Sequence, residues 1–185
     1  MRRVIAVLAM CLFCVACAAE DKYISPALEF RTALIQAKGC SFVAEVTADF
    51  GKTVQIFTMD CESDAQDAFY LTVLEPETLK GITATVKESG GQITYDGLAM
   101  DFGLLANGNV IPAAAPAIVA ACWTDEYISA AGEQGEEYRV TYEKNFDENR
   151  LIVDTWFKKG VPICAEICYN NQRIIKITIR DFSFN

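Results

Sequence analysis

The chain of 185 residues contains no histidine. This absence excludes Ser-His-Asp and Cys-His catalysis, and it excludes zinc sites with histidine ligands. Carboxylates remain as groups for acid–base chemistry, but the 25 acidic residues are scattered, and no pair stands out by its spacing. We therefore expect solvated strand faces and turns for these acids, and no catalytic residue, metal site or cofactor.

Long hydrophobic runs are also missing. The uncharged run from Val4 to Val15 follows Met1-Arg2-Arg3 and is shorter than the roughly 20 apolar residues that cross a membrane. The small residues Ala16-Cys17-Ala18-Ala19 come directly after it. A positive start, a short apolar run and small residues at its end are typical of a secretory signal. We expect residues 1–16 to be a signal peptide and the protein to be exported.

Cys17 is the predicted site of lipid attachment. Val15-Ala16-Cys17 resembles the end of a bacterial lipobox, in which a cysteine after a small residue is lipidated, although Cys14 stands where leucine is usual. Several acyl chains on one cysteine would anchor the protein firmly to the membrane. The alternative is ordinary cleavage after Ala18 or Ala19, which would give a secreted soluble protein.

Basic side chains are scarce in the remaining chain. Without Arg2 and Arg3, 14 basic and 25 acidic side chains leave a net charge of −11. Such a surface does not suit nucleic acid or anionic lipid head groups. Residues 17–185 are long enough to bury a core, and we expect one domain with residues 17–25 as a short tether.

The pattern of apolar and turn residues predicts an α+β fold. Ser25-Pro26 begins a helix that runs to about Lys38 and ends at Gly39, and a second helix is expected at about 112–123. The remaining segments predict about eleven strands, at about 40–48, 53–62, 69–75, 82–88, 91–96, 98–103, 126–131, 136–144, 150–158, 161–169 and 173–183. Their short connections predict an antiparallel sheet.

Cys40 and Cys61 are predicted to form a disulfide across the first hairpin. A turn centred between Phe50 and Gly51 places these two cysteines opposite each other, on the face that also carries Phe42, Phe57 and Met59. Directly opposed residues are close enough for a disulfide. The alternative is a pair of buried, reduced thiols.

Three further cysteines are predicted to be small core residues. Cys164 and Cys168 lie about 13 Å apart on one strand face and cannot pair with each other. Either could meet Cys122 if the second helix lay over that strand. The last hairpin, at Asn170-Asn171, could have a two-residue or a three-residue loop, and these put opposite faces of its second strand beside Ile163 and its neighbours.

The order of elements resembles a known family. One helix, six antiparallel strands, a second helix and five further strands, behind a lipoprotein-like signal, look like the LolA/LolB-type lipoprotein carrier fold. Short stretches also resemble GerS-type germination lipoproteins and related clostridial lipoproteins, namely residues 30–34 and 39–42, Glu75-Pro76 with Gly81-Ile82-Thr83, and residues 162–167 with 173–175. The resemblance implies a strongly curved, unclosed barrel with two helices on its concave side. It also implies a cavity for acyl chains in the carriers, and a protein partner in spore-cortex processing in the germination branch.

Three functions are compatible with these features. The first is a non-enzymatic lipoprotein that binds an apolar ligand such as an acyl chain, or a protein of the envelope or spore. Its groove would be lined by Phe42, Phe57, Met59, Ile118 and Val119, unless these are simply core residues. The second is a partner-dependent scaffold factor in spore germination or cortex processing, without a lipid ligand. The third is an enzyme that uses two carboxylates on a glycan, which no feature singles out.

Overall fold

The computed structural model describes residues 24–49, 51, 53–64, 68–87, 89–106, 109–146 and 149–185. The expected signal peptide, Cys17 and most of the expected tether lie outside these residues.

A helix at residues 24–37 opens the described chain, within one residue of the predicted bounds. It ends where Lys38 and Gly39 adopt positive φ angles of 61° and 135°, a common way for a helix to stop. Gly39 is also the first residue of β1 (Gly39–Asp49). A Cβ atom at this position would lie 2.1 Å from the carbonyl oxygen of Ser63, so the close approach of the two strands requires glycine.

Eleven strands form one antiparallel sheet, in the order β6-β5-β4-β3-β2-β1-β13-β12-β11-β10-β9. Their bounds are β1 Gly39–Asp49, β2 Val54–Asp64, β3 Phe69–Glu75, β4 Thr83–Lys87, β5 Gly90–Tyr95, β6 Leu98–Phe102, β9 Tyr127–Gln134, β10 Glu137–Phe146, β11 Asn149–Lys158, β12 Val161–Tyr169 and β13 Gln172–Phe184. The first and last strands pair in the middle of the sheet, while β6 and β9 are its two edges. The predicted unclosed antiparallel sheet is thus confirmed.

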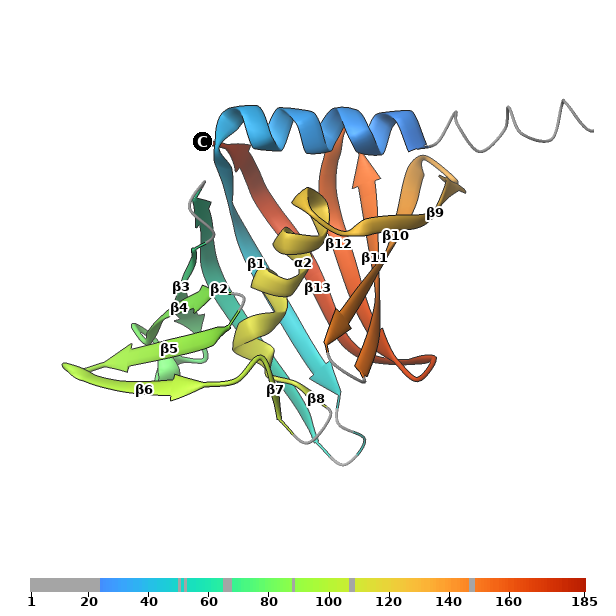
Figure 1. The fold of residues 1–185 in the computed structure, drawn as a ribbon. Helices are drawn as coiled ribbons and strands as arrows, with labels where there is room; N and C mark the ends of the chain where they lie inside the picture. The colour runs from blue at the N-terminus through green and yellow to red at the C-terminus, as the bar shows by residue number, and fades with distance from the viewer. Residues whose placement is uncertain are drawn as a thin grey trace, which may run out of the picture.

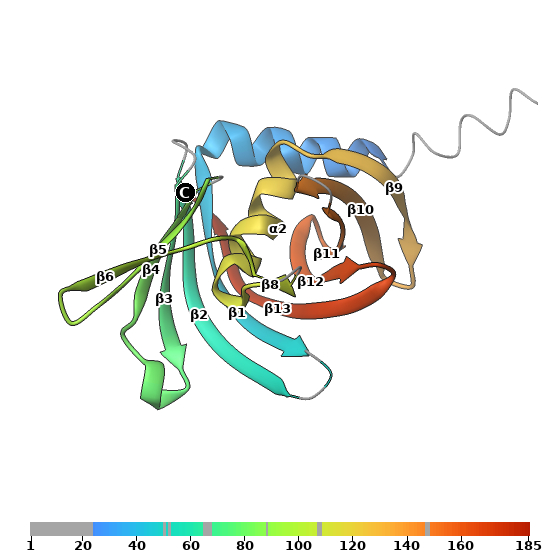
Figure 2. The ribbon, with the colours of Figure 1, turned by 60° about the horizontal axis from the view of Figure 1, so that its bottom comes forward.

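The connection from one edge of the sheet to the other passes through its hollow. It contains the short pair β7 (Leu105–Ala106) and β8 (Asn109–Val110), a turn at Pro112–Ala114, and helix α2 (Ala115–Thr124). Figures 1 and 2 show α2 within the curved sheet and the N-terminal helix across one end of it. Both helices therefore lie on the concave side, as the resemblance implied. The pair β7–β8 and a turn of 3₁₀ helix at Glu77–Leu79 were not predicted from the sequence.

Aromatic side chains fill much of the hollow. The Phe30 ring on the N-terminal helix lies 5.7 Å from Trp123 on α2 and 4.9 Å from Phe157 on β11, measured between ring centroids. Trp123 is fully buried, and its indole N–H donates a hydrogen bond of 3.1 Å to the Thr155 hydroxyl. Edge-to-face contacts of this kind add to the stabilisation from burial alone. They fix both helices against the sheet.

The predicted register of the first hairpin is wrong by two residues. Cys61 lies opposite Phe42, and Cys40 lies opposite Ser63, whose hydroxyl is 3.5 Å from the Cys40 sulfur. The backbone N–H of Gly51 donates to the Asp49 carboxylate, and the strands resume pairing at Asp49 and Val54, so the loop is centred later than predicted. Because the shift is even, the predicted apolar face is still the buried one.

The predicted Cys40–Cys61 disulfide is not confirmed: both thiols are free and buried in the structure. Burial raises the pKa of the Cys40 thiol to about 11, an effect reduced by its contact with Ser63. Burial also raises the pKa of Cys61. Protonated thiols are poor nucleophiles, so this pair behaves as part of the apolar core.

The last hairpin combines a two-residue loop with a bulge. Asn170 and Asn171 both have positive φ angles, and Tyr169 pairs with Gln172. The register then shifts between Ile167 and Cys168, so that Ile175 lies opposite Ile167. Because of the bulge, β13 turns the same face toward Ile167 as it would after a three-residue loop without a bulge.

The three remaining cysteines do not share one environment. Cys122 is fully buried on α2, as predicted, whereas Cys164 and Cys168 are only partly buried. Both alternate with the buried Ala165 and Ile167 and so lie on the convex face, away from α2. The prediction that they are core residues is wrong, because the face of β12 that carries them is opposite the buried face of Ala165 and Ile167.

Candidate functional site

A cavity of about 530 Å³ lies where the two helices meet one half of the sheet. Its volume is within the range of about 300–1,000 Å³ typical of small-molecule sites. The walls come from the end of the N-terminal helix, from α2, and from the adjoining ends of β2, β3 and β4. The residues that line it are Leu34, Ile35, Lys38, Gly39, Ser63, Asp64, Ala68, Phe69, Val86, Lys87, Leu104, Ala117, Ile118, Ala120, Ala121, Thr124, Asp125, Glu126 and Lys144.

The cavity is lined by both apolar and charged side chains, and its charges are balanced. Leu34, Phe69, Val86 and Ile118 are buried side chains that contribute to the lining. The charged lining residues comprise three lysines, Lys38, Lys87 and Lys144, and three acids, Asp64, Asp125 and Glu126. A site of this kind favours a ligand whose body is apolar and whose polar end carries little net charge.

One ion pair of the lining is largely removed from solvent. The Lys144 ammonium on β10 binds the Glu126 carboxylate, and the Lys144 side chain is 10% exposed. A buried lysine is costly unless it is paired, so the pair holds both side chains at the lining. It thereby links the end of α2 to the far half of the sheet.

Arg31 fixes the position of α2 beside the cavity. Its guanidinium donates to three carbonyl oxygens at the end of α2, those of Trp123 at 2.8 Å, Cys122 at 3.2 Å and Glu126 at 2.6 Å. The last carbonyls of a helix have no partner within the helix and carry a partial negative charge. A cation from the N-terminal helix satisfies them and joins the two helices, which together form one side of the cavity.

The predicted groove residues are mostly core. Phe42, Met59, Ile118 and Val119 are each at most 2% exposed, and Phe57 is partly buried against the core. Of these five, only Ile118 lines the cavity. The aromatic side chains around α2 fill the space next to Phe42, so the open volume lies nearer the ends of β2–β4. The lining residues Lys38, Asp64 and Lys144 were missed, because they come from distant parts of the sequence and form no motif.

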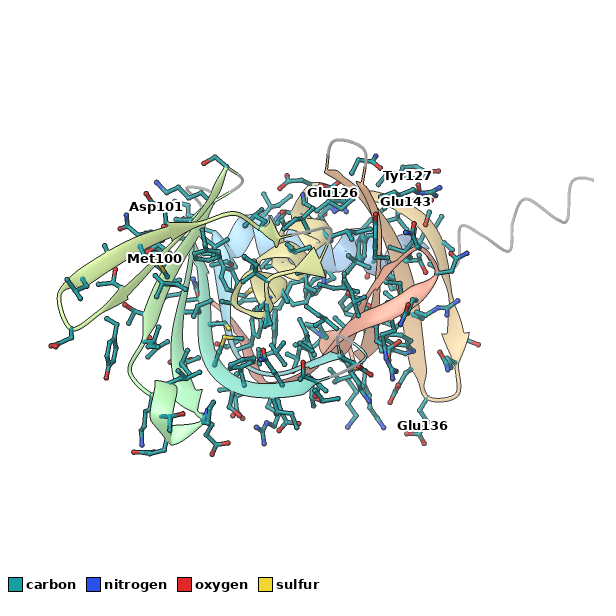
Figure 3. The ribbon with its side chains drawn as sticks, turned by 90° about the horizontal axis from the view of Figure 1, so that it is seen from below. Met100, Asp101, Glu126, Tyr127, Glu136 and Glu143 are labelled. Carbon is teal, nitrogen blue, oxygen red and sulfur yellow. The ribbon has the colours of Figure 1, made fainter. Side chains whose placement is uncertain are left out.

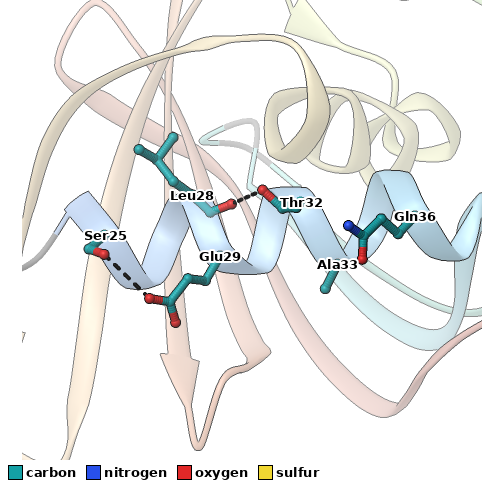
Figure 4. A pocket seen from close by; sticks show the side chains of 6 residues that line it. All are labelled: Ser25, Leu28, Glu29, Thr32, Ala33 and Gln36. Atoms are coloured by element: carbon teal, nitrogen blue, oxygen red, sulfur yellow. Dashed lines mark hydrogen bonds between the residues drawn. The ribbon is translucent and has the colours of Figure 1, made fainter.

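A second, open depression lies on the outward face of the N-terminal helix. It has about 320 Å³ and is lined by Ser25, Leu28, Glu29, Thr32, Ala33 and Gln36 (Figure 4). All six residues belong to one helix, and the Ser25 and Thr32 hydroxyls bond within that helix. A surface formed by one helix does not enclose a ligand, so we take the larger cavity as the candidate site.

Within the part of the chain that the structure describes, no group of three or more Cys, Asp or Glu side chains could hold a metal ion. The same residues include no helix of the length and hydrophobicity needed to span a membrane.

No family model and no curated protein matches the chain. Solved structures similar to it in fold include the following three. A LolA superfamily protein from Nitrosomonas europaea has 9% identity and a TM-score of 0.47, covering 86% of this chain and 93% of that one. A complex of the CwlD amidase with the GerS lipoprotein from Clostridioides difficile has 15% identity and a TM-score of 0.41, and the match covers 78% of this chain and 85% of that one. The lipoprotein LppX of Mycobacterium tuberculosis has 9% identity and a TM-score of 0.40, and the match covers 86% of this chain and 98% of that one.

At these identities the likeness concerns the fold alone. The strand order and the helix positions of this chain define that fold by themselves: eleven antiparallel strands form one unclosed sheet, with two helices on its concave side.

Proposed function

We propose that the protein is a non-enzymatic, extracytoplasmic binding protein whose ligand is an apolar molecule such as an acyl chain. The cavity of about 530 Å³ carries this proposal, because buried apolar side chains share its lining with three ammonium and three carboxylate groups. The equal number of ammonium and carboxylate groups favours a ligand with a neutral or zwitterionic polar end. In this role the sheet positions α2, and α2 and the N-terminal helix enclose the ligand.

The ligand is tested by extracting lipid from the purified mature protein and identifying it by mass spectrometry. We expect a co-purified lipid, and we expect the apolar dye N-phenyl-1-naphthylamine to bind with enhanced fluorescence. Finding neither a lipid nor dye binding would overturn the proposal.

Filling the cavity is expected to abolish dye binding. Ala121 lines the cavity and is partly exposed, so Ala121→Phe would place a phenyl ring in the open volume at a moderate cost in stability. We expect the affinity for the dye to fall at least tenfold. Ala130→Phe, at an exposed position on β9, is the matched control and is expected to bind the dye normally. Equal binding by all three proteins would show that the dye site lies elsewhere.

We also propose that Cys17 anchors the protein to the outer face of the cell membrane, through a lipid added after removal of residues 1–16. Six residues lie between Cys17 and the start of the described helix at residue 24, so the seven Cα–Cα steps span at most about 25 Å. The domain of residues 17–185 would thus stay close to the membrane surface.

Cys17→Ser is expected to move the protein from the membrane fraction to the soluble exported fraction, because an acyl anchor needs the thiol. Detergent phase partitioning of cell extracts measures the change. Cys14→Ser removes a neighbouring thiol of the signal and is expected to leave the protein in the detergent phase. If both variants partition like the unaltered protein, Cys17 is not the anchor.

A further inference from the structure

The apolar face of the sheet continues beyond the part that the helices cover. Leu71 on β3, Ala84 on β4, Ile93 on β5 and Met100 on β6 lie in one row across four strands. Leu71 and Ala84 are 3% and 4% exposed, whereas Met100 is 65% exposed. The buried face of the sheet thus becomes an uncovered apolar surface at the edge strand.

The hairpin β5–β6 carries this uncovered surface. Tyr95 and Leu98 form the next pair on the same face of the hairpin and are 54% and 77% exposed. Figures 1 and 3 show the hairpin projecting from one end of the sheet, with Met100 on it. An exposed apolar patch that continues a core face marks an interaction site more often than scattered apolar residues do.

The edge strand is suited to pairing with another strand. Natural sheets protect their edges with lysine, proline or bulges, and β6 has the sequence Leu-Ala-Met-Asp-Phe and pairs with β5 without a register shift. Its outer edge faces no other strand in the sheet order. An added strand would extend the sheet and cover the apolar row.

The charges around this edge indicate what kind of strand fits. Residues 88–138 include both edge strands and contain no lysine or arginine. Asp96 and Asp101 are the acidic residues of this segment on the β5–β6 hairpin, whereas Asp125 and Glu126 line the cavity and Glu133, Glu136 and Glu137 lie near the opposite edge of the sheet. Asp101 alternates with Met100 and so lies on the opposite face of β6, where Gln92 donates to its carboxylate at 2.9 Å.

We propose that β6 is a docking edge for an extended segment of a partner protein in which apolar and basic residues alternate. The apolar side chains of that segment would cover Leu98, Met100 and Phe102, and the basic side chains would lie on the face of Asp101. A second copy of this chain fits poorly, because it would bring the same acidic segment to the edge. The proposal does not rest on the cavity or its ligand, because Leu98, Met100 and Phe102 are not among the cavity-lining residues, although Leu104 just beyond β6 is.

The test uses a fluorescein-labelled peptide, Lys-Val-Lys-Ile-Lys-Val-Lys, titrated with the protein at low salt and followed by anisotropy. We expect binding that weakens at least tenfold when glutamate replaces every lysine of the peptide. Methylation of the backbone nitrogens of the peptide is also expected to abolish binding, because strand addition requires its N–H groups.

Variants at the two edges locate the site. Met100→Lys changes an exposed side chain and is expected to weaken peptide binding at least tenfold, while Tyr127→Lys, at a 73% exposed position on the opposite edge, leaves it unchanged. Peptide binding should also protect the amides of residues 98–102 from hydrogen exchange.

The proposal is overturned if the lysine peptide does not bind, if the glutamate or methylated peptide binds equally well, or if both variants lose binding alike. A dimer of the protein that Met100→Lys dissociates would also overturn it.

Discussion

Arg31→Met is expected to lower the free energy of unfolding by about 3 kcal/mol. The substitution keeps an apolar stem of similar length but removes the donors for the carbonyl oxygens of Cys122, Trp123 and Glu126. A hydrogen bond from a charged donor contributes roughly 1.5–3 kcal/mol, and the partly buried acceptors would be left without a partner. Urea denaturation followed by tryptophan fluorescence measures the change, because Trp123 lies at the affected helix end.

Two further variants separate this network from a general effect of lost charge. Arg31→Lys keeps the charge but cannot reach three carbonyls at once, and we expect it to recover less than half of the loss. Arg173→Met removes an exposed arginine that pairs with Glu166 on the convex face, and we expect a change below about 1 kcal/mol. A loss after Arg31→Met no larger than that after Arg173→Met would contradict the role given to Arg31.

Gly39→Ala is expected to cost a similar amount, about 3 kcal/mol, for a different reason. The added Cβ would lie 2.1 Å from a backbone oxygen of β2, and the residue has a φ of 135° that alanine rarely adopts. Backbone strain and overpacking each cost about 1–3 kcal/mol. The clash involves backbone atoms of both strands, so a side-chain rotation cannot relieve it. Thermal unfolding measured by circular dichroism gives the loss.

Gly132→Ala is the matched control. Gly132 also lies on a strand, β9, but it has no atom within 4 Å of the added Cβ and no positive φ. We expect Gly132→Ala to change the free energy of unfolding by less than about 0.5 kcal/mol, as for other surface substitutions. If the Gly39 and Gly132 variants were equally stable, the tight junction between helix and sheet at Gly39 would be disproved.

The order of the elements could be predicted because each carries a local signal. Gly90-Gly91 and Asp96-Gly97 sit at the hairpins of β4–β5 and β5–β6, and alternation between apolar and polar residues identifies the strands. Gly39 marks the end of the first helix. The short strands β7 and β8 were missed, because two residues are too few to show alternation.

The registers could not be predicted with the same certainty. The side chain of Asp49 moves the first loop, and a bulge beside Ile167 reverses the face set by the Asn170-Asn171 turn. Neither feature has a periodic signal, since a bulge adds one residue to one strand only. The predicted disulfide failed on this point, although the face assigned to its cysteines was correct.

The site itself depends on contacts between distant segments. Lys38, Asp64 and Lys144 meet around the cavity only because α2 crosses from β6 to β9 through the hollow. Arg31 looks like an ordinary polar residue of an amphipathic helix until the end of α2 is placed beside it. Apolar residues of the core and of the cavity lining have the same composition, so the sequence could not show which would border open space.

The central claim is that an apolar ligand occupies the space between α2 and the ends of β2–β4. A crystal structure of the protein purified with its bound lipid tests it most directly. We expect elongated electron density for the ligand beside Phe69, Val86 and Ile118, with the polar end of the ligand toward the charged lining residues. A cavity collapsed by movement of α2 onto the sheet, or lipid bound only outside the cavity, would disprove this claim.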